Sequence, residues 1–78
     1  MPDRRSAAGW VIELVSPNPS GAPPTLRYFN VNEPDIAKAI VAAKKKAGVN
    51  DIVGQVVRAL TSEEVKKLGL HKGQAKPA

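Results

Sequence analysis

Residues 9–15 read GWVIELV, with a large apolar side chain at every second position. These side chains belong to Trp10, Ile12 and Leu14. A period of two in β-branched and aromatic residues is typical of a β-strand. The pattern therefore predicts a strand over residues 9–15.

A second strand is expected after a proline-rich loop. Residues 16–24 (SPNPSGAPP) contain four prolines, and proline lacks the N–H that a strand ladder needs. Residues 25–31 (TLRYFNV) are rich in strand formers, so strand, loop and strand together predict a wide hairpin. The nine-residue loop is too long for a tight turn, so the register of the hairpin is left open. We interpret the loop as a stiffened connection rather than a contact for a partner.

The clearest element is a helix in residues 32–48 (NEPDIAKAIVAAKKKAG). Asn32 is a good N-cap, Pro34 suits the first turn, and Gly48 suits the position just past the end. The acidic residues near its start favour the positive end of the helix dipole. The residues that recur at helical spacing, and that form its apolar face, are Ile36, Ile40, Ala43 and Ala47.

Residues 49–60 (VNDIVGQVVRAL) give conflicting signals. Their valine and isoleucine content favours a strand. However, Ile52, Val56 and Leu60 recur at helical spacing, and Asp51 could cap such a helix. We predict a strand over residues 54–60, because a third strand would complete a sheet on which the long helix can pack.

A second, short helix is expected within residues 60–70 (LTSEEVKKLGL). Thr61 and Glu64 have the spacing of a capping box, and Gly69 suits the position after the last turn. The stretch LGLHKGQ (residues 68–74) resembles a leucine-glycine-hydrophobic, lysine, glycine stretch of AbrB-like transition-state regulators, which are DNA-binding swapped-hairpin dimers. The resemblance covers seven residues, and a helix C-cap followed by a turn produces the same pattern. We therefore transfer neither the fold nor DNA-binding residues from that family.

The elements together predict a small α+β domain of the order β-β-α-β-α, with one helix packed on a short sheet. We expect a single domain in residues 9–70, between flexible tails at residues 1–8 and 71–78. A chain of 78 residues without cysteine must fold on aliphatic packing alone. Its core would be small, so docking or self-association would help to stabilise it.

Residues that could perform catalysis are scarce. The chain has no cysteine and a single histidine, His71, which follows the second helix. No nucleophile–histidine set, no metal-ligand spacing and no phosphate-binding glycine loop is evident. We therefore expect no catalytic, cofactor or metal site, and a protein that is not an enzyme.

The apolar runs are short. None approaches the roughly 18 residues that a membrane-spanning helix needs. The run from Trp10 to Val15 is interrupted by Glu13 and is too short for a secretory signal. We expect a soluble cytoplasmic protein without a membrane partner.

Positive charge is concentrated in the second half of the chain. Residues 1–39 hold four basic and four acidic residues, whereas residues 40–78 hold eight basic and three acidic ones, for a net charge of +5. This asymmetry is compatible with an anionic partner, although it also serves solubility. The candidate contacts for an anion or a nucleic acid are Lys44, Lys45, Lys46, Arg58, Lys66 and Lys67.

The lysine triplet at residues 44–46 has two interpretations. At about 100° per residue, Lys45 points away from the apolar face, near Lys38 in direction, while its two neighbours lie on the flanks. Lysine in a last helical turn is favoured by the dipole without any ligand. We prefer that interpretation, so the function is unknown beyond a non-enzymatic binding or interaction module, with another protein or a second copy as partner. The alternative is a weak, sequence-independent nucleic-acid-binding protein.

Overall fold

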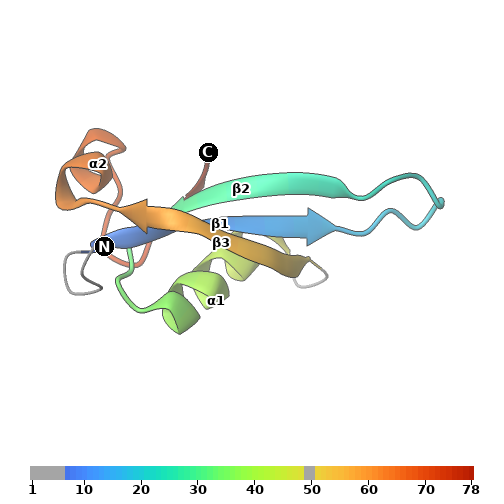
Figure 1. Ribbon diagram of the computed structural model, residues 1–78, viewed down its shortest axis with the longest axis horizontal. Coiled ribbons are helices and arrows are strands. Elements are labelled where there is room, and N and C mark those ends of the chain that lie inside the picture. The colour runs from blue at the N-terminus through green and yellow to red at the C-terminus, as the bar shows by residue number, and fades with distance from the viewer. Residues whose placement is uncertain (1–6, 49–50) are drawn as a thin grey trace.

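A computed structural model describes residues 7–48 and 51–78 of the chain. Within these ranges the elements are β1 (Gly9–Ser16), β2 (Thr25–Val31), α1 (Ile36–Ala47), β3 (Ile52–Leu60), α2 (Ser62–Lys67) and β4 (Ala75–Pro77) (Figure 1). The strands form one antiparallel sheet in the order β3-β1-β2-β4. This confirms the predicted α+β class and the β-β-α-β-α order, to which β4 is added.

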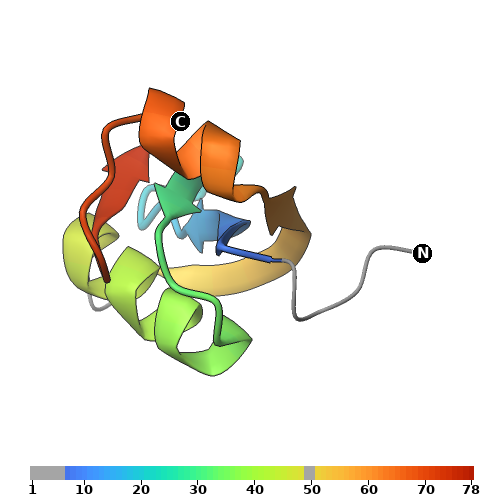
Figure 2. The ribbon, with the colours of Figure 1, turned by 90° about the vertical axis from the view of Figure 1, so that its left-hand side faces the viewer.

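The two helices cover opposite faces of the sheet, as the view along its long direction shows (Figure 2). α1 packs on the face that carries Ile12 and Leu14, both fully buried. The other buried residues of this core are Phe29, Val31, Ala39, Ala43 and Ala75. α2 packs on the opposite face, at one end of the sheet, where the buried residues are Val11, Leu60, Val65 and Leu70. Because side chains alternate along a strand, β1 supplies both cores.

α1 begins three residues later than the predicted N-cap would place it. The N-cap is Asp35, whose carboxylate accepts a hydrogen bond from the backbone N–H of Lys38 at 3.2 Å. Asn32 was the wrong choice, because its side-chain amide donates to the carbonyl of Leu70 at 3.1 Å instead. The predicted end is confirmed, since Gly48 caps the helix with a positive φ.

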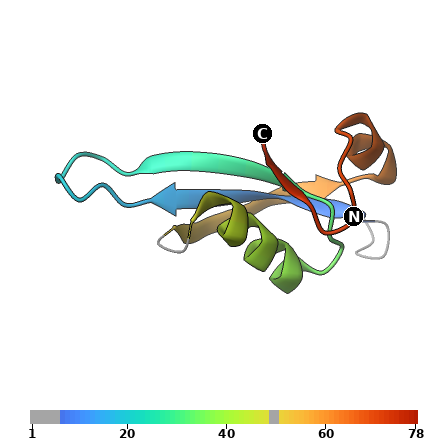
Figure 3. The same ribbon diagram turned by 180° about the vertical axis from the view of Figure 1, so that it is seen from behind.

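Small residues let α1 approach the sheet closely. The face that is fully buried consists of Ala39 and Ala43. Ile40 and Ala47, which the sequence placed on the apolar face, pack against that core while partly buried. Seen from behind, the helix lies across the sheet (Figure 3). Ile36, also predicted on that face, is half-buried but is not among the residues packed against this core. The predicted apolar face is therefore correct only in part, and alanines occupy its centre.

β3 is a strand, and two irregularities explain its helix-like spacing. Its register with β1 shifts twice, so that Gly54 and Val57 have no partner in β1. Each shift is a β-bulge, which adds one residue to the strand. As a result Val53 and Val56, both packed against the core, stand three residues apart instead of two. The bulges therefore produce a spacing of core residues that is typical of a helix, although the segment is a strand.

The short α2 has the predicted termini. Thr61 accepts a hydrogen bond from the N–H of Glu64, and the Glu64 carboxylate accepts one from the N–H of Thr61, which completes the capping box. Gly69 follows the helix with φ of 66°. Val65 and Leu70 are buried, so the helix is attached to the sheet by these apolar contacts.

Residues 71–78 were expected to form a flexible tail, but they bring a fourth strand to the sheet. β4 pairs with the C-terminal end of β2, with Ala75 opposite Val31. The N–H of Gly73 donates to the carbonyl of Asn32 at 2.7 Å, and the N–H of Ala78 donates to that of Tyr28 at 2.8 Å. The strand forms because the exposed edge of β2 offers backbone partners. A three-residue strand has no period that a sequence pattern could reveal.

The predicted N-terminal tail lies mostly outside the described residues, which begin at Ala7. Ala7 is buried, and the N–H of Ala8 donates to the carbonyl of Leu60 at 2.9 Å. At the opposite end of the sheet, the hairpin loop of residues 17–24 protrudes, and all its residues are exposed (Figures 1 and 3).

The close approach of β1 to β2 at Gly9 provides a test of this packing. A Cβ atom at Gly9 would collide with the backbone carbonyl of Val31, which the sheet holds in place. We expect Gly9→Ala to lower the free energy of unfolding by about 1–3 kcal/mol, as overpacking of a core does. Gly54→Ala is the control, because its Cβ would meet only side-chain atoms, those of Glu13 and Val15. The Glu13 carboxylate can turn away at the cost of its exposed hydrogen bonds, so this substitution should cost less than a collision with backbone. Urea denaturation followed by circular dichroism measures both; an equal or smaller loss for Gly9→Ala would contradict the packing.

Candidate interaction surfaces

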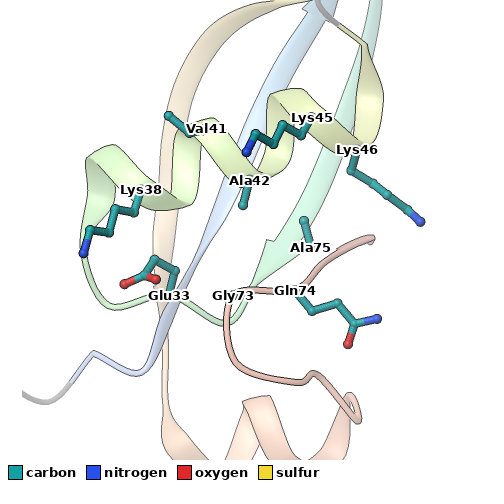
Figure 4. Close-up of a pocket in the computed structure, with 9 residues that line it drawn as sticks. All are labelled: Glu33, Lys38, Val41, Ala42, Lys45, Lys46, Gly73, Gln74 and Ala75. Carbon is teal, nitrogen blue, oxygen red and sulfur yellow. The ribbon is translucent and has the colours of Figure 1, made fainter.

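A cleft of about 440 Å³ separates α1 from the turn that leads into β4 (Figure 4). Its walls contain the small residues Ala42, Gly73 and Ala75, which leave the space between helix and turn unfilled. Charged side chains surround this space: Lys38, Lys45 and Lys46 on α1, and Glu33 before the helix. The cleft therefore combines a narrow uncharged floor with a mostly basic rim.

The lysine triplet is divided by this geometry. Lys45 and Lys46 line the cleft together with Lys38, so Lys46, which the sequence placed on a flank, shares this surface with Lys45. Lys44 is half-buried and does not line the cleft. Among the described residues both ion pairs use arginine, namely Arg27–Asp51 and Arg58–Glu64, and no lysine takes part in one. The lysines at the cleft therefore retain uncompensated charge.

The other candidate residues lie on the opposite face of the sheet. Lys66 and Lys67 are exposed in α2. Arg58 projects from β3 toward α2, where its guanidinium donates to both carboxylate oxygens of Glu64, at 2.7 and 3.1 Å. The structure thus separates the six candidate residues into two groups on opposite faces. Through this pair Arg58 links β3 to α2 at the surface.

The environment of Glu64 strongly favours its charged form. The hydrogen bonds from Arg58 and then the backbone hydrogen bond from Thr61 lower the pKa of the carboxyl group to about 2. The same pairing raises the pKa of Arg58. The pair is largely exposed to solvent, so it contributes little to stability compared with the buried Val65 and Leu70.

An apolar row crosses the open face of the sheet, opposite α1 and beyond the end that α2 covers. Val15 is paired with Leu26 on one side and with Ile52 on the other, so the three side chains point the same way. Leu26 is 51% exposed and Ile52 is 60% exposed. Sequence reasoning missed this row, because the hairpin loop left the register of β2 undetermined.

A polar row lies next to the apolar one on the same face. Glu13 is paired with Tyr28 and with Gln55, and its carboxylate accepts hydrogen bonds from both, at 2.9 and 3.3 Å. The hydrogen bond to Glu13 and the negative charge of that residue raise the pKa of Tyr28. The open face therefore presents an aliphatic row beside an ordered row of hydrogen-bonding groups.

The buried Asp51 serves the fold. It is 8% exposed and accepts a hydrogen bond from the hydroxyl of Ser16 at 2.8 Å, while Arg27 lies 3.8 Å from the same carboxylate oxygen. The guanidinium carbon of Arg27 lies 5.7 Å from the centre of the Phe29 ring. Asp51 therefore joins the start of β3 to the hairpin instead of capping a helix.

Within residues 7–48 and 51–78, no group of three or more histidine, cysteine, aspartate or glutamate residues could hold a metal ion. His71 is exposed. The helices of that part of the chain are too short and too polar to cross a bilayer.

In comparisons with known proteins, no family model, no curated protein and no solved structure matches this chain.

The pairing of Arg58 with Glu64 can be tested by titration. In the folded protein the Glu64 carboxyl should have a pKa of about 2, against an ordinary value of 4.5. Because the folded value is the lower one, the pair contributes fully above pH 4.5, and its contribution is lost as the pH falls toward 2. NMR of the side-chain carbonyl measures the pKa directly. Arg58→Gln should raise the pKa of Glu64. Lys66→Gln removes an equal charge from α2, the helix that contains Glu64, and should leave this pKa nearly unchanged. Equal effects of the two substitutions would contradict the assigned cause.

Proposed function

We propose that this protein is a non-enzymatic interaction module that docks another protein on the open face of its sheet. The observation that carries the proposal is the row of Leu26, Val15 and Ile52, which crosses three strands and is left uncovered by the elements of residues 7–48 and 51–78. Burying an aliphatic side chain of this size contributes about 1.5–3 kcal/mol. In a chain with so small a core, leaving such residues on one exposed row favours their use in binding.

The neighbouring polar row supports a specific partner. Glu13 is held by Tyr28 and Gln55, so a partner meets hydrogen-bonding groups of fixed position beside the apolar row. Tyrosine is among the residues enriched at protein interfaces, because its ring is apolar and its hydroxyl is polar. The apolar row would supply affinity and the polar row would supply orientation.

The edge strands β3 and β4 are poor alternatives to the face. β3 carries two bulges, which interrupt a regular ladder, and β4 has only three residues and ends with Pro77. Bulges, short strands and edge prolines are the features by which proteins prevent a further strand from pairing. A partner is therefore expected to pack on side chains rather than to extend the sheet.

Sequence-independent nucleic-acid binding receives less support. The six candidate basic residues lie on two opposite faces, and Arg58 is engaged by Glu64. A backbone of phosphates needs a continuous basic surface. We also propose that the protein is cytoplasmic, as expected from the sequence.

Site-specific photo-crosslinking in the native host tests the docking face. Leu26, 51% exposed on the open face, and Leu68, 40% exposed at the end of α2, are each replaced by a photoreactive phenylalanine analogue. We expect the variant at position 26 to form one discrete protein adduct that the variant at position 68 does not form. The similar exposure of the two positions controls for random encounters.

A second substitution tests whether the same row provides the affinity. Ile52→Lys, placed in the variant with the crosslinker at position 26, should reduce the adduct at least tenfold, because a lysine ammonium opposes burial. Unchanged circular dichroism would verify the fold. If position 26 yields no adduct, or yields the same adducts as position 68, the proposal is wrong.

A further inference from the structure

We propose that the cleft between α1 and β4 binds a short acidic peptide segment in an extended conformation. This inference does not rest on the docking face described above, because the cleft lies on the other side of the sheet and involves different residues. The binding groups are the ammonium groups of Lys38, Lys45 and Lys46, and the floor is formed by Ala42 and Ala75.

The charge of the cleft selects an anion. Three lysines and one carboxylate, Glu33, line it, and no lysine forms an ion pair within the described part of the chain. The Glu33 carboxylate is already an acceptor for the backbone N–H of Asp35, at 3.3 Å. An acidic ligand would pair with these ammonium groups at little desolvation cost, because the lysine side chains extend along an open surface.

The spacing of the lysines selects a chain rather than a compact anion. Lys38 and Lys46 are eight residues apart in α1, which corresponds to about 12 Å along the helix axis at ~1.5 Å per residue. Figure 4 shows Lys38 at one end of the cleft and Lys46 at the other, with their ammonium groups pointing apart. An extended peptide advances about 3.3 Å per residue, so roughly four residues would span this distance. A single phosphate or carboxylate could not contact both ends.

The lining also distinguishes a peptide from a nucleic acid. It contains neither an arginine nor an aromatic side chain, although binding of single strands relies on aromatic stacking. Small residues at Ala42, Gly73 and Ala75 instead leave a narrow floor on which a peptide backbone could lie. Gly73 has φ of 76°, so the turn that forms this wall depends on glycine.

A peptide titration with matched charge variants tests the inference. The probe is a fluorescently labelled hexaglutamate peptide, and binding is measured by fluorescence anisotropy at about 150 mM salt, where long-range attraction is largely screened. One variant combines Lys38→Gln with Lys45→Gln in the cleft. The control combines Lys66→Gln with Lys67→Gln on α2, and it removes the same charge from the opposite face. Glutamine is a good helix former, so both should fold.

We expect the cleft variant to bind the peptide at least tenfold more weakly than the parent protein, and the control to bind within about twofold, since charge-assisted hydrogen bonds are lost only in the cleft. Backbone NMR shifts on titration should be largest at Ala42, Gly73 and Ala75. Equal weakening of the two variants would show attraction by net charge alone and would overturn the proposal, as would the absence of measurable binding. Tighter binding of a single-stranded DNA oligomer, lost with the same cleft variant, would replace the peptide by a nucleic acid.

Discussion

β1 packs against a hydrophobic core on each face of the sheet, and the rest of the structure depends on this constraint. It lies between β2 and β3, so its backbone is paired on both sides. Ile12 and Leu14 pack under α1, whereas Val11, which is the adjacent residue, packs under α2. A shift of one residue in its pairing would exchange the two faces and expose both cores. Gly9 belongs to the same constraint, since a larger residue would push β2 away.

The basic residues divide by type. The two arginines of the described residues, Arg27 and Arg58, are used within the fold, each beside a carboxylate. The lysines lie in the helices, in β4 and in the turn before it, without such partners among those residues. This division agrees with the chemistry of the side chains, because a planar guanidinium forms two parallel hydrogen bonds, whereas an ammonium is a mobile point charge. The surplus positive charge is therefore on groups that are free to meet a ligand.

Short-range signals made most elements predictable from the sequence, because caps and alternation act between residues close in the chain. The Thr61–Glu64 capping box and the end of α1 at Gly48 are confirmed for this reason. β4 and the apolar row of the open face were not predictable, since both depend on the register of β2. Ala75 belongs to the core only because it pairs with Val31. The separation of the candidate lysines similarly depends on which face of the sheet each helix covers. A local sequence pattern does not predict that face.

The protruding hairpin loop gives this molecule a practical attachment point. The strands on either side are paired as far as Ser16 and Thr25, and residues 17–24 are exposed throughout. Lengthening a loop costs only about 0.6 kcal/mol for each doubling of its length. A reporter domain or an affinity epitope could therefore be inserted between Ser20 and Gly21, which keeps it away from both helices. The same chain would then carry a label while both termini and both helices stay unmodified.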